Sequence, residues 1–343
     1  MVGRAVTPGA RLAELAPGLG HVVLGASPTP VRLLDLDLGA DVWLKDESVF
    51  GDGGWGGNKV RKLQWIIPEA RRRGSRTLFT VGGIGTHWGL ACALYGREHG
   101  LETVLGLVDQ PVDDHVREQL TRLEASGARL YRFPSTRRLK LAAPWILLRH
   151  RPWYLPAGGS NAFGTLGYVD VALEIAGQVA AGELPAPGTV VVPVGSGGTV
   201  TGLTLGFRLA GLDTRVLGAV VNDMLPLDAP AMTRLAGRTS ALLRARGLTD
   251  VPELGEGDFD LRDDWLGTAY GDPTPASVSE VERAREQGLS LEPVYTGKSL
   301  AAVRSLAAAG GSSLPGPVLW LNTHGPRKMT RPPGTIPTPA PLR

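Results

Sequence analysis

The sequence predicts an α/β fold with two domains, built on open twisted sheets flanked by helices. Short apolar segments with strand character alternate with longer segments of helical periodicity, and this alternation is typical of parallel sheets. The segment Thr189–Val194 is almost entirely apolar, as expected for a strand buried on both faces. At 343 residues the chain is long enough for one or two domains with large cores.

The first half of the chain is expected to alternate strands with helices. In order, we expect a strand at 41–44, a helix at 59–73, a strand at 77–81, a helix at 87–99, a strand at 103–108 and a helix at 114–125. Gly100 and Gly127 lie just beyond two of these helices, where glycine commonly ends a helix. Pro68 lacks the N–H that a helix interior requires, so we expect the helix at 59–73 to break there.

The second half continues the alternation. We expect a helix at 166–181, a strand at 189–194, a helix that follows the turn at 195–199 and continues to Leu209, and strands at 216–221 and 318–322. The tail from Arg331 contains five prolines among thirteen residues, so it is predicted to be disordered.

Charge and composition are those of an ordinary soluble globular protein. The net charge is +3, with 43% hydrophobic and 20% charged residues. The basic clusters at 71–73 and 137–140 are not interleaved with aromatic residues, so we interpret them as solvated surface and expect no nucleic-acid partner. The six histidines show no paired ligand spacing, and no metal site is predicted.

The expected compartment follows from what the sequence lacks. No apolar run approaches the roughly 18 residues of a membrane helix, so no membrane partner is expected. Glu14 and Pro17 occupy the segment where a secretory signal needs an apolar core. The single cysteine, Cys92, excludes an internal disulfide, and its apolar surroundings favour a small buried residue over a nucleophile. These features predict a cytoplasmic protein.

Lys59 follows the small residues Gly56–Asn58 at an expected helix start. The positive end of a helix dipole and partial burial both disfavour a charged amine, so the pKa of this lysine is expected to fall. A free amine is what a Schiff-base lysine needs. Lysines after glycines also commonly lie on solvated loops, so this motif alone leaves both interpretations open.

A second turn of small residues, Gly195–Thr199, joins a buried strand to a helix. Converging N–H groups and a helix N-terminus suit a phosphate. The turn is not a Walker loop, because no Lys-Ser or Lys-Thr pair follows at the required spacing. It also lacks the third glycine and the later acidic residue of a dinucleotide fingerprint. We favour a phosphate site over a tight turn without a ligand.

A phosphate site together with a candidate Schiff-base lysine points to pyridoxal phosphate. In addition, the chain resembles the family of 1-aminocyclopropane-1-carboxylate deaminase and D-cysteine desulfhydrase, pyridoxal-phosphate enzymes of the tryptophan-synthase-β fold type (fold type II). The motifs that carry the resemblance, in family order, are Leu44–Glu47, Gly56–Leu63, Val81–Ile84, Pro156–Asn161, Gly167–Tyr168, Gly195–Thr199 and Glu292–Lys298. They span nearly all of the chain, from about Thr29 to Gly325.

The resemblance implies roles for the residues around the cofactor. Lys59 would hold the cofactor covalently and then move the proton at the substrate's α-carbon, while Asn58 would help to orient the ring. The cofactor phosphate would lie on Gly195, Ser196, Gly197, Gly198 and Thr199. The other implied contacts are His87, Thr296 and Thr323 to the cofactor and Gly159 to the substrate.

Tyr295 matches an active-site tyrosine of the family, and Tyr270 occupies the place of a second. Each hydroxyl could donate a proton or position the substrate, or could be the wet tip of a half-buried aromatic residue. Directly after the tyrosine that matches Tyr295, the deaminases carry glutamate, whereas desulfhydrase-like members carry threonine, here Thr296. A hydroxyl supports a protonated pyridine nitrogen less than a carboxylate does, so Thr296 favours β-elimination over the opening of a cyclopropane ring.

The loop Thr86–Trp88 departs from the family, which has Ser-Asn-His or Ser-Asn-Gln where the substrate carboxylate binds. Thr86, an expected catalytic and substrate-binding residue, keeps a hydroxyl, and the helix start can still bind a carboxylate. His87 could bind the carboxylate, contact the ring oxygen, exchange protons, or only cap the helix. Trp88 adds bulk beside the substrate. Near the C-terminus, Thr323–Gly325 has histidine where the family has glycine, and both departures leave the substrate open.

The residues and the resemblance together predict a pyridoxal-phosphate-dependent lyase or deaminase. We expect α,β-elimination from a small amino acid to a 2-oxo acid and ammonia, as in D-cysteine desulfhydrase. The alternatives are a 1-aminocyclopropane-1-carboxylate deaminase, a cysteate sulfo-lyase, a β-replacement synthase, a non-catalytic protein that binds pyridoxal phosphate, and an enzyme with another phosphate ligand. Residues 1–64 and 166–330 are expected to form a large cofactor domain and residues 65–165 a small domain. The assembly is expected to be a homodimer.

Overall fold

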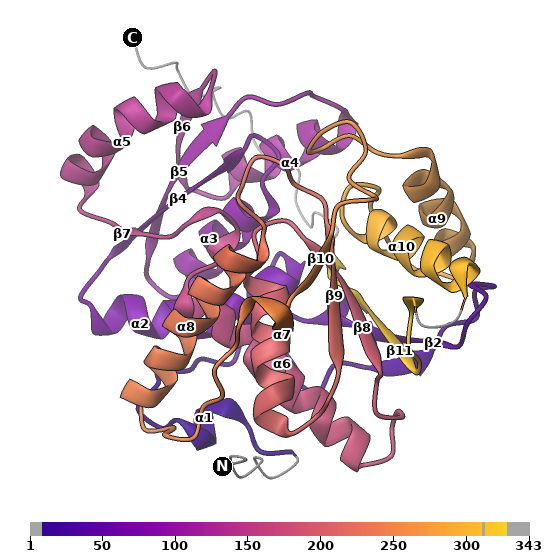
Figure 1. The fold of residues 1–343 in the computed structure, drawn as a ribbon. Coiled ribbons are helices and arrows are strands. Elements are labelled where there is room, and N and C mark those ends of the chain that lie inside the picture. The colour runs from indigo at the N-terminus through magenta and orange to yellow at the C-terminus, as the bar shows by residue number, and fades with distance from the viewer. Residues whose placement is uncertain (1–8, 311–312, 328–343) are drawn as a thin grey trace.

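The computed structural model describes residues 9–310 and 313–327. It has the predicted α/β architecture, in which two main sheets are flanked by helices (Figure 1). In this view a four-stranded sheet lies at the upper left and a six-stranded sheet at the lower right. The tail from Arg331 lies outside the described residues, so the prediction of disorder stays a prediction.

The larger sheet has the strand order β1–β2–β11–β8–β9–β10. Its strands are β1 (Val31–Leu33), β2 (Val42–Asp46), β8 (Thr189–Val194), β9 (Arg215–Val220), β10 (Asp260–Arg262) and β11 (Val318–Asn322). All neighbours pair in parallel except the edge strand β1, which is antiparallel to β2. Parallel neighbours require crossover connections, which here carry helices across the faces of the sheet.

Helices cover both faces of the larger sheet. One face carries α6 (Ala162–Ala180), α7 (Gly198–Ala210) and α8 (Ala229–Ala245), and the other carries α9 (Pro275–Glu286) and α10 (Thr296–Ala309) (Figure 1). Alternate side chains of a strand point to opposite faces. Accordingly, Val190 and Val192 of β8 pack in the core under α6 to α8, and Val191 packs in the core under α10. This two-sided burial explains the apolar character of β8.

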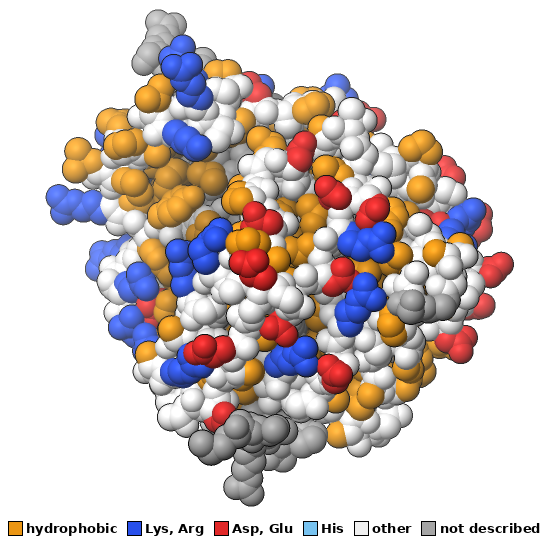
Figure 2. All heavy atoms as spheres, in the orientation of Figure 1, with side chains coloured by type: hydrophobic (Ala, Val, Ile, Leu, Met, Phe, Trp, Pro, Cys, Tyr) orange, Lys and Arg blue, Asp and Glu red, His pale blue; other side chains and the backbone are white. Residues whose placement is uncertain are grey.

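The smaller sheet has the strand order β6–β5–β4–β7, all parallel. Its strands are β4 (Thr77–Gly83), β5 (Glu102–Val108), β6 (Arg129–Phe133) and β7 (Trp153–Tyr154). Helices α2 (Asn58–Arg72), α3 (His87–Glu98) and α4 (Asp114–Ala125) pack on one face, and α5 (Thr136–His150) packs on the other. Figure 2 shows hydrophobic side chains gathered over the region of α5, where Leu141 and Leu148 are 69% and 76% exposed.

Several short elements complete the fold. They are α1 (Leu12–Leu15), β3 (Gly56–Gly57), β12 (His324–Gly325) and the 3₁₀ turns η1 (Glu47–Val49), η2 (Ala157–Gly159) and η3 (Glu256–Asp258). β3 and β12 pair antiparallel, which places His324 opposite Gly57. Gly57 has a φ of 84°, and a Cβ there would lie 2.5 Å from the carbonyl oxygen of Thr323. Glycine is therefore required where the chain turns into α2.

The predicted break at Pro68 is wrong, because α2 continues through this residue. Pro68 has no N–H to donate to the carbonyl of Gln64, four residues earlier. The backbone N–H of Val22 donates to that carbonyl instead, at 3.0 Å. The acceptor that the proline leaves free is thus satisfied by another segment, and the helix remains intact.

The strands and helices expected from the sequence are present, with ends shifted by a few residues. Elements that the sequence did not predict include β6, α5, α8, α9 and α10. Within the described residues, none of the helices is both long and apolar enough to cross a membrane.

Candidate active site

One cavity of about 380 Å³ lies where the carboxyl ends of strands from both sheets meet. Gly82 and Gly83 end β4, Pro193 lies near the end of β8, and Asn222 follows β9, and all of them line the cavity. Ligands of open parallel sheets bind at this edge. The predicted site residues that line the cavity are Asn58, Lys59, Thr86, His87, Trp88, Gly195, Ser196, Thr199, Tyr270, Tyr295 and Thr323. Those that do not are Gly159, Gly197, Gly198 and Thr296.

Lys59 is the second residue of α2, and its side chain reaches the cavity. Its amine has no hydrogen bond or ion pair with any described residue. Burial lowers the pKa of Lys59 to about 8, although the charge of Glu292 acts in the opposite direction. Near neutral pH the side chain therefore supplies much more free amine, the nucleophilic form, than an ordinary lysine does.

The turn Gly195–Thr199 connects β8 to α7 and faces the cavity through Gly195, Ser196 and Thr199. Gly197 has a φ of 85°, and a Cβ there would lie 2.5 Å from the side chain of Met232. A Cβ on Gly198 would lie 2.7 Å from the Ser160 hydroxyl. These two glycines thus allow the turn to pack closely on its support, while their neighbours face the open space.

Lys62 lies directly behind this turn. Its amine donates to the carbonyl of Gly158 at 2.8 Å and to the hydroxyl of Ser160 at 3.2 Å. Ser160 in turn accepts the N–H of Gly198 at 3.0 Å and bonds the hydroxyl of Ser196 at 2.9 Å. Burial, and next the charge of Lys59, hold the pKa of Lys62 well below its usual value. A phosphate bound on the turn would place a negative charge near the amines of Lys59 and Lys62 and so favour their protonated forms.

Tyr270 and Tyr295 meet beside the phosphate turn. Their hydroxyls share a short hydrogen bond, and their rings stand edge to face with centroids 6.2 Å apart. A Cβ on Gly195 would lie 2.7 Å from the Tyr295 ring, so this ring rests directly on the phosphate turn. Burial raises the pKa of both hydroxyls. Both tyrosines therefore stay protonated at neutral pH and can act as donors.

Glu292 lines the cavity and was not among the predicted site residues. Its carboxylate accepts the N–H groups of Val294, Tyr295 and Thr296 at 2.7 to 3.1 Å, which holds the carboxylate at the start of α10. Thr296 is fully buried behind it, and the Thr296 hydroxyl lies 3.1 Å from the Glu292 carboxylate. The threonine therefore faces Glu292 and not the cavity.

Thr86 and Trp88 form one rim of the cavity at the start of α3. The Thr86 hydroxyl accepts the N–H of Gly89 at 3.2 Å and so caps the helix. The indole N–H of Trp88 donates to the Thr80 hydroxyl at 2.8 Å. A Cβ on Gly159 would lie only 2.5 Å from the Trp88 ring. Gly159 therefore makes room for the indole and does not reach the cavity itself.

His87 is joined in the cavity by two histidines from distant segments. Its Nε2 lies 2.8 Å from Nε2 of His115, the second residue of α4. The ring of His324 in β12 has its centroid 5.6 Å from that of His87. The side chain of Trp55 packs on His87 with ring centroids 5.0 Å apart. No group of His, Cys, Asp or Glu side chains among the described residues has an arrangement that could hold a metal ion.

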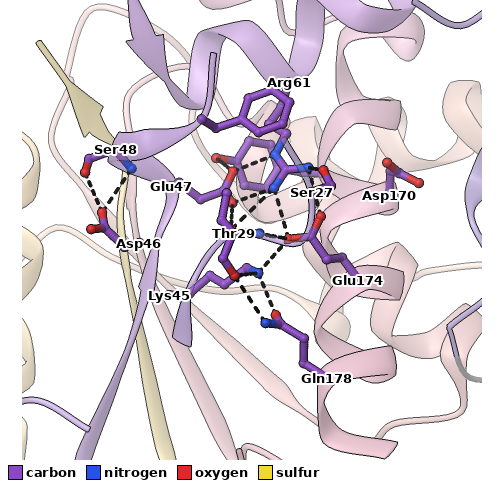
Figure 3. Close-up of polar contacts among 12 residues, drawn as sticks. Ser27, Thr29, Lys45, Asp46, Glu47, Ser48, Arg61, Asp170, Glu174 and Gln178 are labelled. Carbon is purple, nitrogen blue, oxygen red and sulfur yellow. Dashed lines mark hydrogen bonds and ion pairs between the residues drawn. The ribbon is translucent and has the colours of Figure 1, made fainter. Parts of the chain in front are cut away.

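A buried ionic network lies beneath the first turns of α2 (Figure 3). Arg61, fully buried, pairs with Glu47 and with Glu174 of α6, each at 2.9 Å. Lys45 of β2 pairs with Glu174 at 2.6 Å. Burial alone would raise the pKa of Glu174, but Arg61 and Lys45 lower it to about 2. Because Arg61 is two residues from Lys59, this network holds the cavity end of α2 against β2 and α6.

Helix α2 packs closely on α6 at Gly167, where a Cβ would lie 2.5 Å from the Arg61 carbonyl oxygen. The Tyr168 hydroxyl contacts Glu47 at 3.4 Å. The motif Gly167–Tyr168 therefore serves the position of α2 and not the cavity directly.

Comparisons with known proteins agree with this geometry. Residues 22–323 match the model of the pyridoxal-phosphate dependent enzyme family. D-cysteine desulfhydrase of Salmonella choleraesuis (strain SC-B67) is 31% identical over 318 residues, which cover 88% of this chain and 93% of the relative. D-cysteine desulfhydrase of Yersinia enterocolitica serotype O:8 is 32% identical over 305 residues, which cover 86% of this chain and 89% of the relative.

Two solved structures show the fold. A structure described as an ACC deaminase homologue has a TM-score of 0.77 at 25% identity and covers 92% of this chain and 94% of that chain. The processed form of threonine deaminase isoform 2 from Solanum lycopersicum has a TM-score of 0.59 at 15% identity, covers 96% of this chain and 88% of its own, and supports the fold alone. The expected fold type II and the family resemblance are confirmed. The chain belongs to the family of pyridoxal-phosphate dependent enzymes.

Proposed function

We propose that this chain catalyses α,β-elimination from a small amino acid to a 2-oxo acid and ammonia, in the manner of a D-cysteine desulfhydrase. The observation that carries the proposal is the convergence of three groups on one cavity: the unpaired amine of Lys59, the turn Gly195–Thr199, and the paired hydroxyls of Tyr270 and Tyr295. The relatives named D-cysteine desulfhydrase support the substrate class.

The residues present fit pyridoxal phosphate. Gly195, Ser196 and Thr199 form a cradle for a phosphate at the start of α7, with the Lys62 amine behind it. Lys59 is the free amine that would hold the cofactor covalently. Asn58, His87 and Thr323 line the space between them and would contact the ring. When bound, the cofactor supplies an electron sink for the pair left at the substrate's α-carbon.

We propose the following division of roles among the residues of this chain. Once displaced by the substrate amine, Lys59 takes the proton from the α-carbon, because it is held at short range. Thr86 and the free N–H groups at the start of α3 bind the α-carboxylate. The protonated hydroxyls of Tyr295 and Tyr270 donate to the leaving group.

Thr296 would influence the cofactor ring through Glu292, since its hydroxyl bonds that carboxylate and does not line the cavity. The preference for β-elimination over ring opening accordingly rests on the relatives named D-cysteine desulfhydrase and no longer on Thr296 itself. Deamination of 1-aminocyclopropane-1-carboxylate, sulfo-lyase action on cysteate and β-replacement are the competing outcomes.

A product screen tests the function. Holoenzyme is incubated with D- and L-cysteine, 1-aminocyclopropane-1-carboxylate and cysteate, and 2-oxo acid, ammonia, sulfide and sulfite are measured. Sulfide with equimolar pyruvate and ammonia is the expected result from one enantiomer of cysteine. If no amino acid yields a 2-oxo acid or alters the absorption of the bound cofactor, the chain is a non-catalytic binder and the proposal is wrong.

The pKa of Lys59 gives a second expected result. Free amine forms as the pH rises through about 8, so covalent capture of pyridoxal phosphate by the apoprotein should accelerate over that range and level off above it. The rate is followed by stopped-flow absorbance from about pH 6 to 10. A rate that rises only toward the ordinary lysine pKa near 10.4 would contradict the buried environment of Lys59.

We also propose the division into a large domain of residues 1–64 and 166–330 and a small domain of residues 65–165. The four-stranded sheet falls wholly within the small segment and the six-stranded sheet wholly within the large ones, which supports it. Helices α2 and α6 cross the boundaries. A cytoplasmic homodimer is proposed as well, and the exposed apolar side chains of α5 support a contact with a second copy.

A further inference from the structure

The histidine cluster consists of His87, His115 and His324, and the roles above account only for His87, as a contact to the cofactor ring. Each member comes from a different segment: the first residue of α3, the second residue of α4, and β12. All three line the cavity, with ring centroids 5.1 to 6.3 Å apart. His324 is buried, His87 is half-buried and His115 is exposed. Ring nitrogens without a hydrogen bond are therefore costly for His324 above all.

Hydrogen-bond accounting shows that the cluster has unused capacity. His87 and His115 face each other through their Nε2 atoms, and a single proton can lie between them. As neutral rings, the pair therefore has one N–H donor left, at a Nδ1 atom. His324 is only 8% exposed, yet its ring nitrogens have no hydrogen-bond partner among the described residues. A buried, unpaired imidazole that lines a cavity is a group built to meet a ligand.

The helix ends around the cluster favour an anionic ligand. The N-termini of α3 and α4 both carry cluster members and contribute positive potential. The guanidinium of Arg122 lies over Trp55, 5.4 Å from its ring centroid, and pairs with Glu118, so it adds little free charge. Three carboxylates also line the cavity, those of Asp113, Asp272 and Glu292. Backbone N–H groups hold two of them away from the rings, since Asp113 caps α4 through the N–H of Val116 at 2.7 Å and Glu292 accepts the N–H groups at the start of α10.

Burial keeps the rings of His87 and His324 neutral in the free protein. It holds the pKa of His87 well below its usual value, with His324 and His115 acting in the same direction, and it lowers the pKa of His324 to about 4. An anion would stabilise a proton on either ring. The cluster therefore gains its strongest hydrogen bonds only when a negative group is present.

We propose that His87, His115 and His324 bind the substrate's side chain, and that among small amino acids open to α,β-elimination this enzyme prefers one whose side chain ends in an anionic group, such as a sulfonate, over cysteine. The inference rests on the proposed function. For a β-sulfonate substrate, the α-carbon loses its proton and the Cβ–S bond breaks. The sulfur keeps the electron pair and leaves as sulfite. The remaining aminoacrylate takes up water to give pyruvate and ammonia, so no oxidant or reductant is needed.

Aspartate and asparagine provide a matched test, since they differ in charge and hardly in size, and neither has a leaving group at Cβ. Dissociation constants are read from the change in cofactor absorption when each enantiomer is added to holoenzyme. Wild type should bind aspartate about tenfold more tightly than asparagine, which corresponds to one charge-assisted hydrogen bond. His115→Gln and His324→Gln should each weaken aspartate about tenfold and leave asparagine unchanged.

His99→Gln is the matched control, because His99 caps the far end of α3 and should leave both ligands unaffected. The inference is wrong if wild type binds asparagine as tightly as aspartate, a comparison that needs no variant to fold. It is also wrong if the two cluster variants weaken both ligands equally, because the histidines would then bind the α-carboxylate or the cofactor. If the enzyme eliminates from cysteine but binds aspartate no more tightly than asparagine, the anion site is wrong and the proposed function stands. Absence of turnover with any amino acid overturns the proposed function.

Discussion

Lys59→Ala should lose covalent attachment of pyridoxal phosphate and lower turnover by a factor of about 10³ or more. Two functions disappear together, the amine that holds the cofactor and the base at the α-carbon, and removal of a positioned base alone costs about 10²- to 10⁴-fold. The measurements are the absorption of the holoprotein before and after borohydride reduction, the mass of the reduced chain, and kcat. The wild-type chain should gain the mass of one reduced cofactor, and the variant none.

Lys140→Ala is the control for this experiment. Lys140 is an exposed residue of α5, so its variant should retain both the adduct and the turnover. Normal turnover by Lys59→Ala would refute the assigned role. Attachment that persists in the variant would point to Lys62, whose amine is the other lysine group beside the phosphate turn.

Arg61→Met should lower the free energy of unfolding by about 3–5 kcal/mol, the usual cost of removing one partner from a buried ion pair. Arg61 is fully buried, and its guanidinium satisfies both Glu47 and Glu174. It also stacks under Phe50, 3.8 Å from the ring centroid. Methionine fills much of the volume but has no charge. The carboxylates of Glu47 and Glu174 would then share a single buried counter-charge, that of Lys45, which bonds Glu174. Urea unfolding with an unchanged m-value measures the loss.

Arg117→Met provides the comparison, because the Arg117–Asp114 pair is exposed at 64% and 100%. Such pairs are worth about 0–1 kcal/mol. Similar losses for the two variants would mean that Lys45 alone compensates the buried carboxylates, and that the network contributes little to the position of α2.

The residues proposed for the cofactor side of the cavity could be chosen from the sequence because the motifs that contain them are local. Lys59 and the turn Gly195–Thr199 are each read from a few adjacent residues at a helix start, and glycine at 57 and 197 is dictated by positive φ. The α/β fold was equally accessible, since apolar strands such as β8 are buried on both faces. Pro68 misled the prediction because the compensating donor, Val22, lies in a remote segment.

The substrate side depends on contacts between distant segments, which no local pattern reveals. His87, His115 and His324 are widely separated in the chain, so ligand-type spacing does not bring them together. Thr296 and Gly159 belong to matching motifs, yet one supports Glu292 and the other makes room for Trp88. Arg61 also lies in a motif, but its buried role depends on Glu174 of α6.

The two walls of the cavity belong to different sheets. Thr86, His87 and His115 follow strands β4 and β5 of the smaller sheet, whereas the turn Gly195–Thr199 follows β8 of the larger one. Loops at the ends of separate sheets can be exchanged independently. A designer who wishes to redirect this scaffold to a new amino acid should therefore graft the segments after β4 and β5, change His324 with them, and leave the turn after β8 untouched. Trp88, which presses on Gly159 next to Ser160, is the one residue of the graft that should be kept.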